Sequence, residues 1–149
     1  MLSYSAAAPE DYTPSYFFFY GSLMDPEVLQ HILKLPELPL LQPATIKDFK
    51  IKMWSIYPAL VPSPKGTVTG KIWKVETLEH FEKLAAYETA AYTTCPLGIH
   101  RSDTGVIEDG KAFCWKGDPI SLDLEDGIFD FARYQQHFKP SLLGRGRNT

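Results

Sequence analysis

Hydrophobic residues in the first third of the chain change from a continuous run to a spaced stripe, which indicates a strand followed by a helix. Residues 15–20 (SYFFFY) form an apolar run of strand length, typical of a strand buried on both faces. Asp25 then fits a helix N-cap, with Pro26 at the first helical position. An apolar stripe continues from there and predicts a short helix over residues 26–34.

The next segment has the alternating pattern of strands that bend. Residues 44–54 (ATIKDFKIKMW) alternate in two phases, and the slip near Asp48 predicts a β-bulge. Residues 57–66 predict a short strand between prolines, and residues 67–75 predict a separate strand. Gly70 in the middle of that strand indicates a bend or a close approach of another backbone.

The second half of the chain mixes both kinds of element. Thr77 caps a predicted helix that runs to about Tyr87, and residues 92–100 predict a strand. Asp109-Gly110 is a signal for a two-residue hairpin turn, and residues 128–138 fit a C-terminal helix. The sum is an α+β fold of about six strands with two or three flanking helices, and its bulge and mid-strand glycine favour a small, closed or nearly closed mixed β-barrel.

The order of these elements predicts one domain. Residues 1–14 mix alanine, serine, proline and acidic residues without periodicity, and we expect a flexible leader there. Residues 15–139 would form the single domain, followed by a polar tail over residues 140–149.

Composition narrows the class of protein. The 149 residues are 44% hydrophobic and 22% charged, as in ordinary globular proteins, and the net charge of −3 with scattered basic residues argues against a nucleic-acid partner. No apolar run approaches membrane-spanning length, and the N-terminus lacks a secretory signal. Cys95 and Cys114 are the only cysteines, and we expect them to be reduced and buried in a cytoplasmic protein. A small molecule is the expected partner, and the oligomeric state stays open.

Glu88 stands where the predicted helix should contact the core. Leu78, Phe81 and Ala85 define the buried stripe of that helix, and Glu88 follows three residues later. A buried carboxylate has a raised pKa and is suited to proton transfer near neutral pH. The alternative is that the helix frays at Ala86-Tyr87 and that Glu88 points into solvent.

Four segments, in order along the chain, resemble the gamma-glutamylcyclotransferase-like family. They are YGSLM (20–24), YPALVPS (57–63), GTVTGKIWKV (66–75) and LAAYETAAY (84–92). The resemblance covers residues 17–115, and the family includes the plant avirulence-induced-gene-like proteins. The last strand and the acidic C-terminal helix resemble the fungal-type members.

The resemblance implies a small β-barrel that converts a γ-glutamyl amide to 5-oxoproline and a free amine, without a cofactor. It implies that Glu88 is the general acid/base and that the turn made by Tyr20, Gly21, Ser22 and Leu23 binds the glutamyl end. No metal is expected, because the four histidines are dispersed without ligand spacing: His31, His80, His100 and His137.

Three further aromatic residues are candidates for the pocket wall. Tyr57, Tyr92 and Trp115 could contact substrate, although aromatic residues on strands also serve as plain core. Trp115 takes a place often held by tyrosine in the family. Thr89 follows the glutamate where members usually have glycine, and Thr94 stands where arginine is common. These departures concern the walls of the pocket rather than the acid or the turn.

Three functional readings remain open from the sequence. The first is a gamma-glutamylcyclotransferase acting on a γ-glutamyl peptide or amine. The second uses the same pocket and Glu88 as a cyclase, lyase or isomerase on another small molecule, in secondary metabolism. The third is a non-catalytic member that binds a ligand or a protein. Release of 5-oxoproline from γ-glutamyl compounds separates the first reading from the others.

Overall fold

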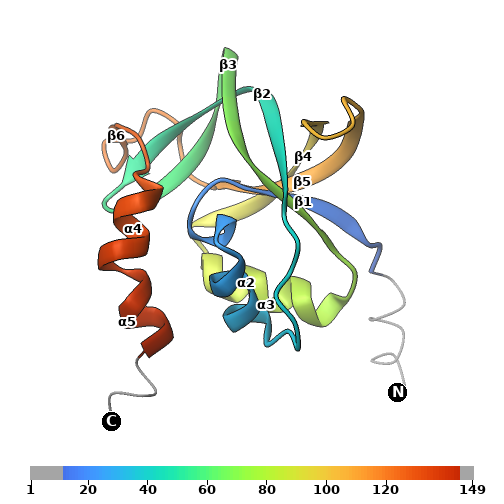
Figure 1. Ribbon diagram of the computed structural model, residues 1–149. Helices are drawn as coiled ribbons and strands as arrows, with labels where there is room; N and C mark the ends of the chain where they lie inside the picture. The colour runs from blue at the N-terminus through green and yellow to red at the C-terminus, as the bar shows by residue number, and fades with distance from the viewer. Residues whose placement is uncertain (1–11, 145–149) are drawn as a thin grey trace, which may run out of the picture.

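Five strands close into a mixed β-barrel, and a short sixth strand extends one edge (Figure 1). The computed structural model describes residues 12–144. Along the sheet the order is β3-β1-β5-β4-β2-β6, and β2 also pairs with β3, which closes the ring. The strands are β1 (Ser15–Phe19), β2 (Gln42–Trp54), β3 (Tyr57–Val75), β4 (Tyr92–Arg101), β5 (Ile107–Trp115) and β6 (Glu125–Asp126). The helices are the 3₁₀ helix η1 (Ser22–Met24), α2 (Pro26–Leu33), α3 (Leu78–Glu88), α4 (Phe131–His137) and α5 (Lys139–Gly144).

Strand β1 runs through the centre of the fold, as its continuous apolar run predicts. It pairs antiparallel with β3 and parallel with β5. Phe18 packs inside the barrel with Ile46 and Leu60. Phe17 and Phe19 point the other way and pack against the helices, with Leu84 of α3 among their neighbours. Both faces of β1 are therefore buried, which explains why its sequence does not alternate.

Strands β2 and β3 form the longest ladder of the barrel. The predicted bulge is confirmed at Asp48, where the register shifts and the backbone has a φ of 70°. The Asp48 carboxylate accepts a hydrogen bond from the Lys65 backbone N–H at 3.0 Å and fixes the bend. The division of residues 57–75 into two strands is wrong, because β3 continues through its prolines and pairs Pro62 with Phe49.

Asp25 joins the N-terminal helix to the C-terminal helices. Asp25 is 2% exposed. Its carboxylate caps α2 at the Glu27 backbone N–H and accepts hydrogen bonds from Gln135 and Lys139. Burial alone would raise the pKa of Asp25, but the hydrogen bonds from Gln135 and Lys139 outweigh it and hold the pKa below its usual value. The predicted capping role is confirmed, and the same side chain also anchors α4 and α5 beside the barrel.

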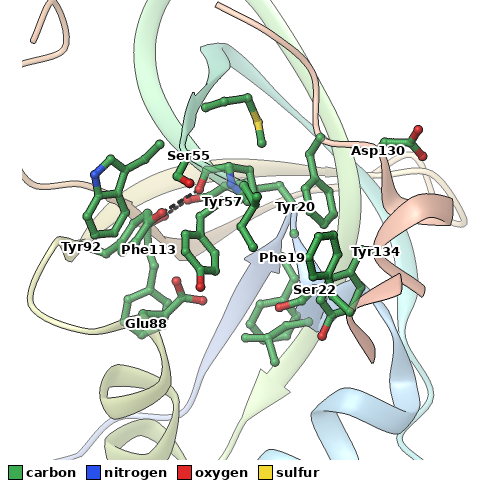
Figure 2. Close-up of a pocket in the computed structure, with 18 of the residues that line it drawn as sticks. Phe19, Tyr20, Ser22, Ser55, Tyr57, Glu88, Tyr92, Phe113, Asp130 and Tyr134 are labelled. Carbon is green, nitrogen blue, oxygen red and sulfur yellow. Dashed lines mark hydrogen bonds between the residues drawn. The ribbon is translucent and has the colours of Figure 1, made fainter. Parts of the chain in front are cut away.

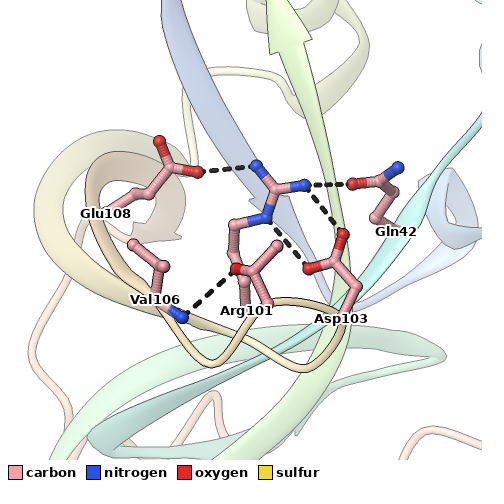
Figure 3. A network of polar contacts seen from close by, with 6 residues as sticks. Gln42, Arg101, Asp103, Val106 and Glu108 are labelled. Carbon is pink, nitrogen blue, oxygen red and sulfur yellow. Dashed lines mark hydrogen bonds and ion pairs between the residues drawn. The ribbon is translucent and has the colours of Figure 1, made fainter.

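The predicted Asp109-Gly110 turn is wrong. Both residues lie inside β5, where Asp109 pairs with Gly98. Strands β4 and β5 turn instead at residues 102–106, where Arg101 binds Asp103, Glu108 and Gln42 in one polar network (Figure 3). Long-range pairing with β4 overrides the local turn preference.

The two cysteines are not reduced, contrary to expectation. Cys95 on β4 and Cys114 on β5 are joined by a disulfide, with their Cα atoms 6.3 Å apart. The two strands are neighbours in the sheet, so the residues are brought together by strand pairing that cysteine spacing does not reveal.

The ends of the domain differ in part from the expected boundaries. Residues 1–11 of the expected leader lie outside the described part of the chain, and the Tyr12 hydroxyl donates a hydrogen bond to the Val75 carbonyl. The expected tail over residues 140–149 is described only to Gly144, where residues 139–144 form α5. The predicted helix over residues 128–138 begins at Phe131, and β6 precedes it. Within residues 12–144, no helix combines the length and apolar character needed to cross a membrane.

Gly70→Ala should lower the free energy of unfolding by about 1–3 kcal/mol, as overpacking does. A Cβ at this position would collide with the Phe19 carbonyl oxygen and would lie 2.8 Å from the Phe18 ring. Gly98→Ala is the matched control, because its Cβ would meet only Ile107 at 3.6 Å. Urea denaturation of both variants measures the effect, and equal stability of the two would contradict a close approach at Gly70.

Candidate active site

A cavity of about 810 Å³ opens at one end of the barrel (Figure 2). Its inner wall comes from the end of β1, the turn after it and the end of α3, and its outer wall comes from the β2–β3 hairpin and the segment that leads into α4. Buried residues such as Phe19, Leu23 and Phe113 lie on the inner side, whereas Tyr57 is 54% exposed and Ile128 is 85% exposed.

The turn over residues 20–23 lines the cavity. Strand β1 ends at Phe19, and the chain turns at once into η1. Gly21 has a φ of −127°, so it is not needed for a left-handed backbone. A Cβ there would lie 2.9 Å from the Pro58 ring, and glycine therefore allows the turn to pack against β3.

Hydroxyl groups surround this turn. The buried Tyr20 hydroxyl donates to the Phe113 carbonyl at 2.5 Å, which fixes its ring across the barrel. The Ser22 and Tyr87 hydroxyls lie 2.6 Å apart, and Tyr134 from α4 interacts with Tyr87. Ser22 is therefore held by residues from α3 and from the C-terminal helix.

Glu88 is the last residue of α3 and lines the cavity. Phe81, Leu84 and Ala85 pack α3 against the core, and the helix does not fray before Glu88. In Figure 2 the carboxylate points into the space beside Tyr57 and Tyr92. Burial raises the pKa of Glu88 to about 7, so the carboxyl group holds or releases a proton near neutral pH.

Two phenols share this environment with Glu88. Burial raises the pKa of Tyr20 and of Tyr92, and the negative charge of Glu88 raises both further. The Tyr92 hydroxyl donates to the Pro58 carbonyl at 2.8 Å. Both phenols therefore stay neutral around Glu88 and act as hydrogen-bonding groups rather than as bases.

Seven of the eight residues predicted for the site line this one cavity: Tyr20, Gly21, Ser22, Leu23, Tyr57, Glu88 and Tyr92. Trp115 does not line it and packs behind Tyr92 and Trp54, with ring centroids 6.0 and 5.2 Å away. Of the two threonines that depart from the family pattern, Thr89 lines the cavity and Thr94 does not.

Sequence reasoning missed residues on both walls of the cavity. Trp54 and Tyr87 stand within predicted elements, and their orientation toward the cavity carries no local sequence signal. Phe129, Arg133 and Tyr134 come from the C-terminal segment, which the predicted helix includes without a site role. The part of the chain that the structure describes contains no cluster of three or more histidine, cysteine or acidic side chains able to hold a metal ion.

Comparison with known proteins decides the family. The sequence profile of a family described as gamma-glutamyl cyclotransferase, AIG2-like, matches residues 17–130. The chain belongs to this family. AIG2-like protein A of Arabidopsis thaliana is 35% identical over 129 residues, covering 85% of this chain and 75% of that protein.

Solved structures show the same fold for this member of the gamma-glutamylcyclotransferase-like family. A solution structure of an Arabidopsis thaliana protein superimposes with a TM-score of 0.63 at 28% identity, over 91% of this chain and 90% of that chain. A structure described as gamma-glutamyl cyclotransferase superimposes with a TM-score of 0.59 at 15% identity, over 70% of this chain and 68% of that one. The expected barrel fold is therefore confirmed.

The raised pKa of Glu88 predicts a pH-dependent cost to stability. In the unfolded chain a glutamate has a pKa of about 4.3. The folded protein therefore binds the Glu88 proton more tightly than the unfolded chain does. The stability that this proton provides is lost as the pH rises from about 4.3 to about 7. Glu88→Gln cannot ionise. Its stability relative to the parent should therefore increase between pH 4 and pH 8, by up to about 3 kcal/mol.

Urea denaturation of parent and variant at several pH values measures this difference. Glu82→Gln is the control, because Glu82 is exposed on the same helix. If the difference in free energy of unfolding between Glu88→Gln and the parent stays constant from pH 4 to pH 8, burial does not shift the pKa of Glu88.

Proposed function

We propose that the protein is a gamma-glutamylcyclotransferase that converts a γ-glutamyl amide to 5-oxoproline and a free amine. Glu88 is the general acid/base, and the turn over residues 20–23 holds the glutamyl end. The observation that carries the proposal is the convergence of Glu88 and this turn on one cavity in a member of the family. The fold and the family alone would be compatible with a binding protein, so the argument depends on the geometry of the site.

The reaction needs few catalytic groups from the protein, because the nucleophile is part of the substrate. The α-amine attacks the γ-carbonyl carbon and closes a five-membered ring. A cavity that holds the glutamyl chain folded would supply a large part of the rate enhancement through orientation. The Phe19 and Leu23 side chains are buried and packed into the core, which suits this positioning role.

Glu88 can carry the proton through both halves of the reaction. Its carboxylate first takes a proton from the α-ammonium, and the amine then attacks to give a tetrahedral oxyanion. The carboxylic acid next gives this proton to the departing nitrogen as the bond between carbonyl carbon and nitrogen breaks. The carboxylate that results takes the second proton from the ring nitrogen, which leaves 5-oxoproline with one ring N–H, and Glu88 then loses that proton to the released amine or to water. A pKa of about 7 suits both steps, because neither protonation state is strongly favoured at neutral pH.

The turn offers donors for the substrate. In η1 the Met24 and Asp25 N–H groups bond back to Gly21 and Ser22, so the N–H groups of Ser22 and Leu23 are not used by the turn itself. The Ser22 hydroxyl, held by Tyr87, adds a further polar group. Such groups can bind a carboxylate or stabilise the oxyanion.

Glu88→Gln should lower the turnover number by about 10²–10⁴-fold, because the amide cannot transfer a proton. Substrate affinity should change less than turnover, since the shape of the side chain is nearly preserved. Release of 5-oxoproline from a panel of γ-glutamyl amides provides the assay.

Glu82→Gln should leave turnover unchanged, because Glu82 does not line the cavity. If Glu88→Gln keeps near-parent turnover, Glu88 is not the proton carrier. If the parent releases no 5-oxoproline from any member of the panel, the proposed reaction itself is wrong.

A further inference from the structure

The cavity is larger than the glutamyl half of a substrate requires. Cavities of roughly 300–1,000 Å³ enclose drug-sized ligands, and this one measures about 810 Å³. A γ-glutamyl group bound between the turn and Glu88 fills the inner part only. The outer part must then receive whatever is attached to the γ-nitrogen, the amine half of the substrate.

Aromatic side chains from two separate parts of the chain line this outer part. Trp54 and Tyr57 flank the β2–β3 hairpin, with ring centroids 6.0 Å apart. Phe129 and Tyr134 belong to the C-terminal segment, with ring centroids also 6.0 Å apart. We call these four residues the amine subsite. Figure 2 places Tyr57 and Tyr134 on different sides of the cavity.

These rings are not explained by core packing alone. Tyr57 is 54% exposed, and Trp54, Phe129 and Tyr134 are all partly exposed on the cavity wall. Large aromatic surfaces left open on two walls of one cavity provide stacking faces for a planar ligand. An aliphatic group would bury the same surface without that gain.

The charged residues at the opening disfavour a carboxylate on the amine half. Glu125, Asp126 and Asp130 line the cavity together with one cation, Arg133. Asp126 also lies 4.0 Å from Lys52, which offsets part of its charge. The balance stays negative, so a free carboxylate entering beside the amine subsite meets net repulsion, reduced by salt.

We propose that the amine subsite binds an aromatic ring, so that the preferred substrate is a γ-glutamyl amide of an arylalkylamine without a carboxylate. This inference rests on the proposed function for its chemistry, but the binding it predicts can be measured separately. The reaction is balanced as above: the ring closes, the amide bond breaks, and the arylalkylamine leaves with the proton from Glu88.

Three synthetic compounds test the proposal: γ-glutamyl-2-phenylethylamide, γ-glutamyl-butylamide and γ-glutamyl-phenylalanine. The second lacks the ring, and the third adds a carboxylate. The value of kcat/KM should be at least about tenfold higher for the phenylethylamide than for the butylamide, as expected for an apolar group of this size. It should also exceed the value for γ-glutamyl-phenylalanine.

Variants assign the effect to the amine subsite. Phe129→Ala and Tyr57→Ala should each reduce the preference for phenylethylamide over butylamide severalfold. Phe131→Ala is the matched control, because Phe131 contacts Phe129 but does not line the cavity. Turnover of the butylamide shows in each case that the variant is folded.

Binding to the Glu88→Gln protein separates this inference from the proposed reaction. Calorimetry should show tighter binding of the phenylethylamide than of the butylamide, even where turnover is absent. Equal affinity for the two, or a preference for γ-glutamyl-phenylalanine, would overturn the inference. If the phenylethylamide binds more tightly but the parent forms no 5-oxoproline from any compound, the reaction is wrong and the amine subsite stands.

Discussion

The pairing of β3 with both β1 and β2 is the constraint on which the rest of the structure depends. Lys71 of β3 pairs on both sides, with Phe19 on β1 and with Pro43 on β2. This double pairing closes the sheet, and it requires the bulge at Asp48 and the absence of a side chain at Gly70. Because β3 also carries Pro58, the strand that closes the barrel supports the turn at the cavity floor.

Closure of the barrel also determines where Glu88 lies. Helix α3 follows β3 with a short connection, and its packed face brings its C-terminal end to the open end of the barrel. A helix C-terminus presents carbonyl groups, so nothing in α3 stabilises a negative charge on Glu88. Burial raises the pKa of Glu88, so the fold loses stability at neutral pH by keeping this carboxyl group in the cavity.

Sequence patterns predict the elements whose structure is set by residues close together in the chain. The run from Tyr16 to Tyr20, the bulge at Asp48 and the caps at Asp25 and Thr77 all follow from sequence patterns. The failures depend on distant partners: Asp109-Gly110 becomes strand by pairing with β4, and Cys95 meets Cys114 through the same ladder. Periodicity alone does not decide whether α3 extends to Glu88, because a pattern locates helix ends poorly, whereas the family resemblance favours a buried Glu88.

The C-terminal part of the outer wall was missed because its position depends on Asp25, a buried carboxylate far away in the sequence. Asp25 caps α2 and also binds Gln135 and Lys139, which fixes the C-terminal helices beside the opening. The family profile matches residues 17–130, so it includes the turn and Glu88 but ends just before α4. Under the proposed reaction, the matched region would perform the cyclisation and would supply Trp54, Tyr57 and Phe129 of the amine subsite, to which α4 adds Tyr134. The two tasks would then be coupled through Asp25, since the residue that caps α2 also binds Gln135, the neighbour of Tyr134 on α4.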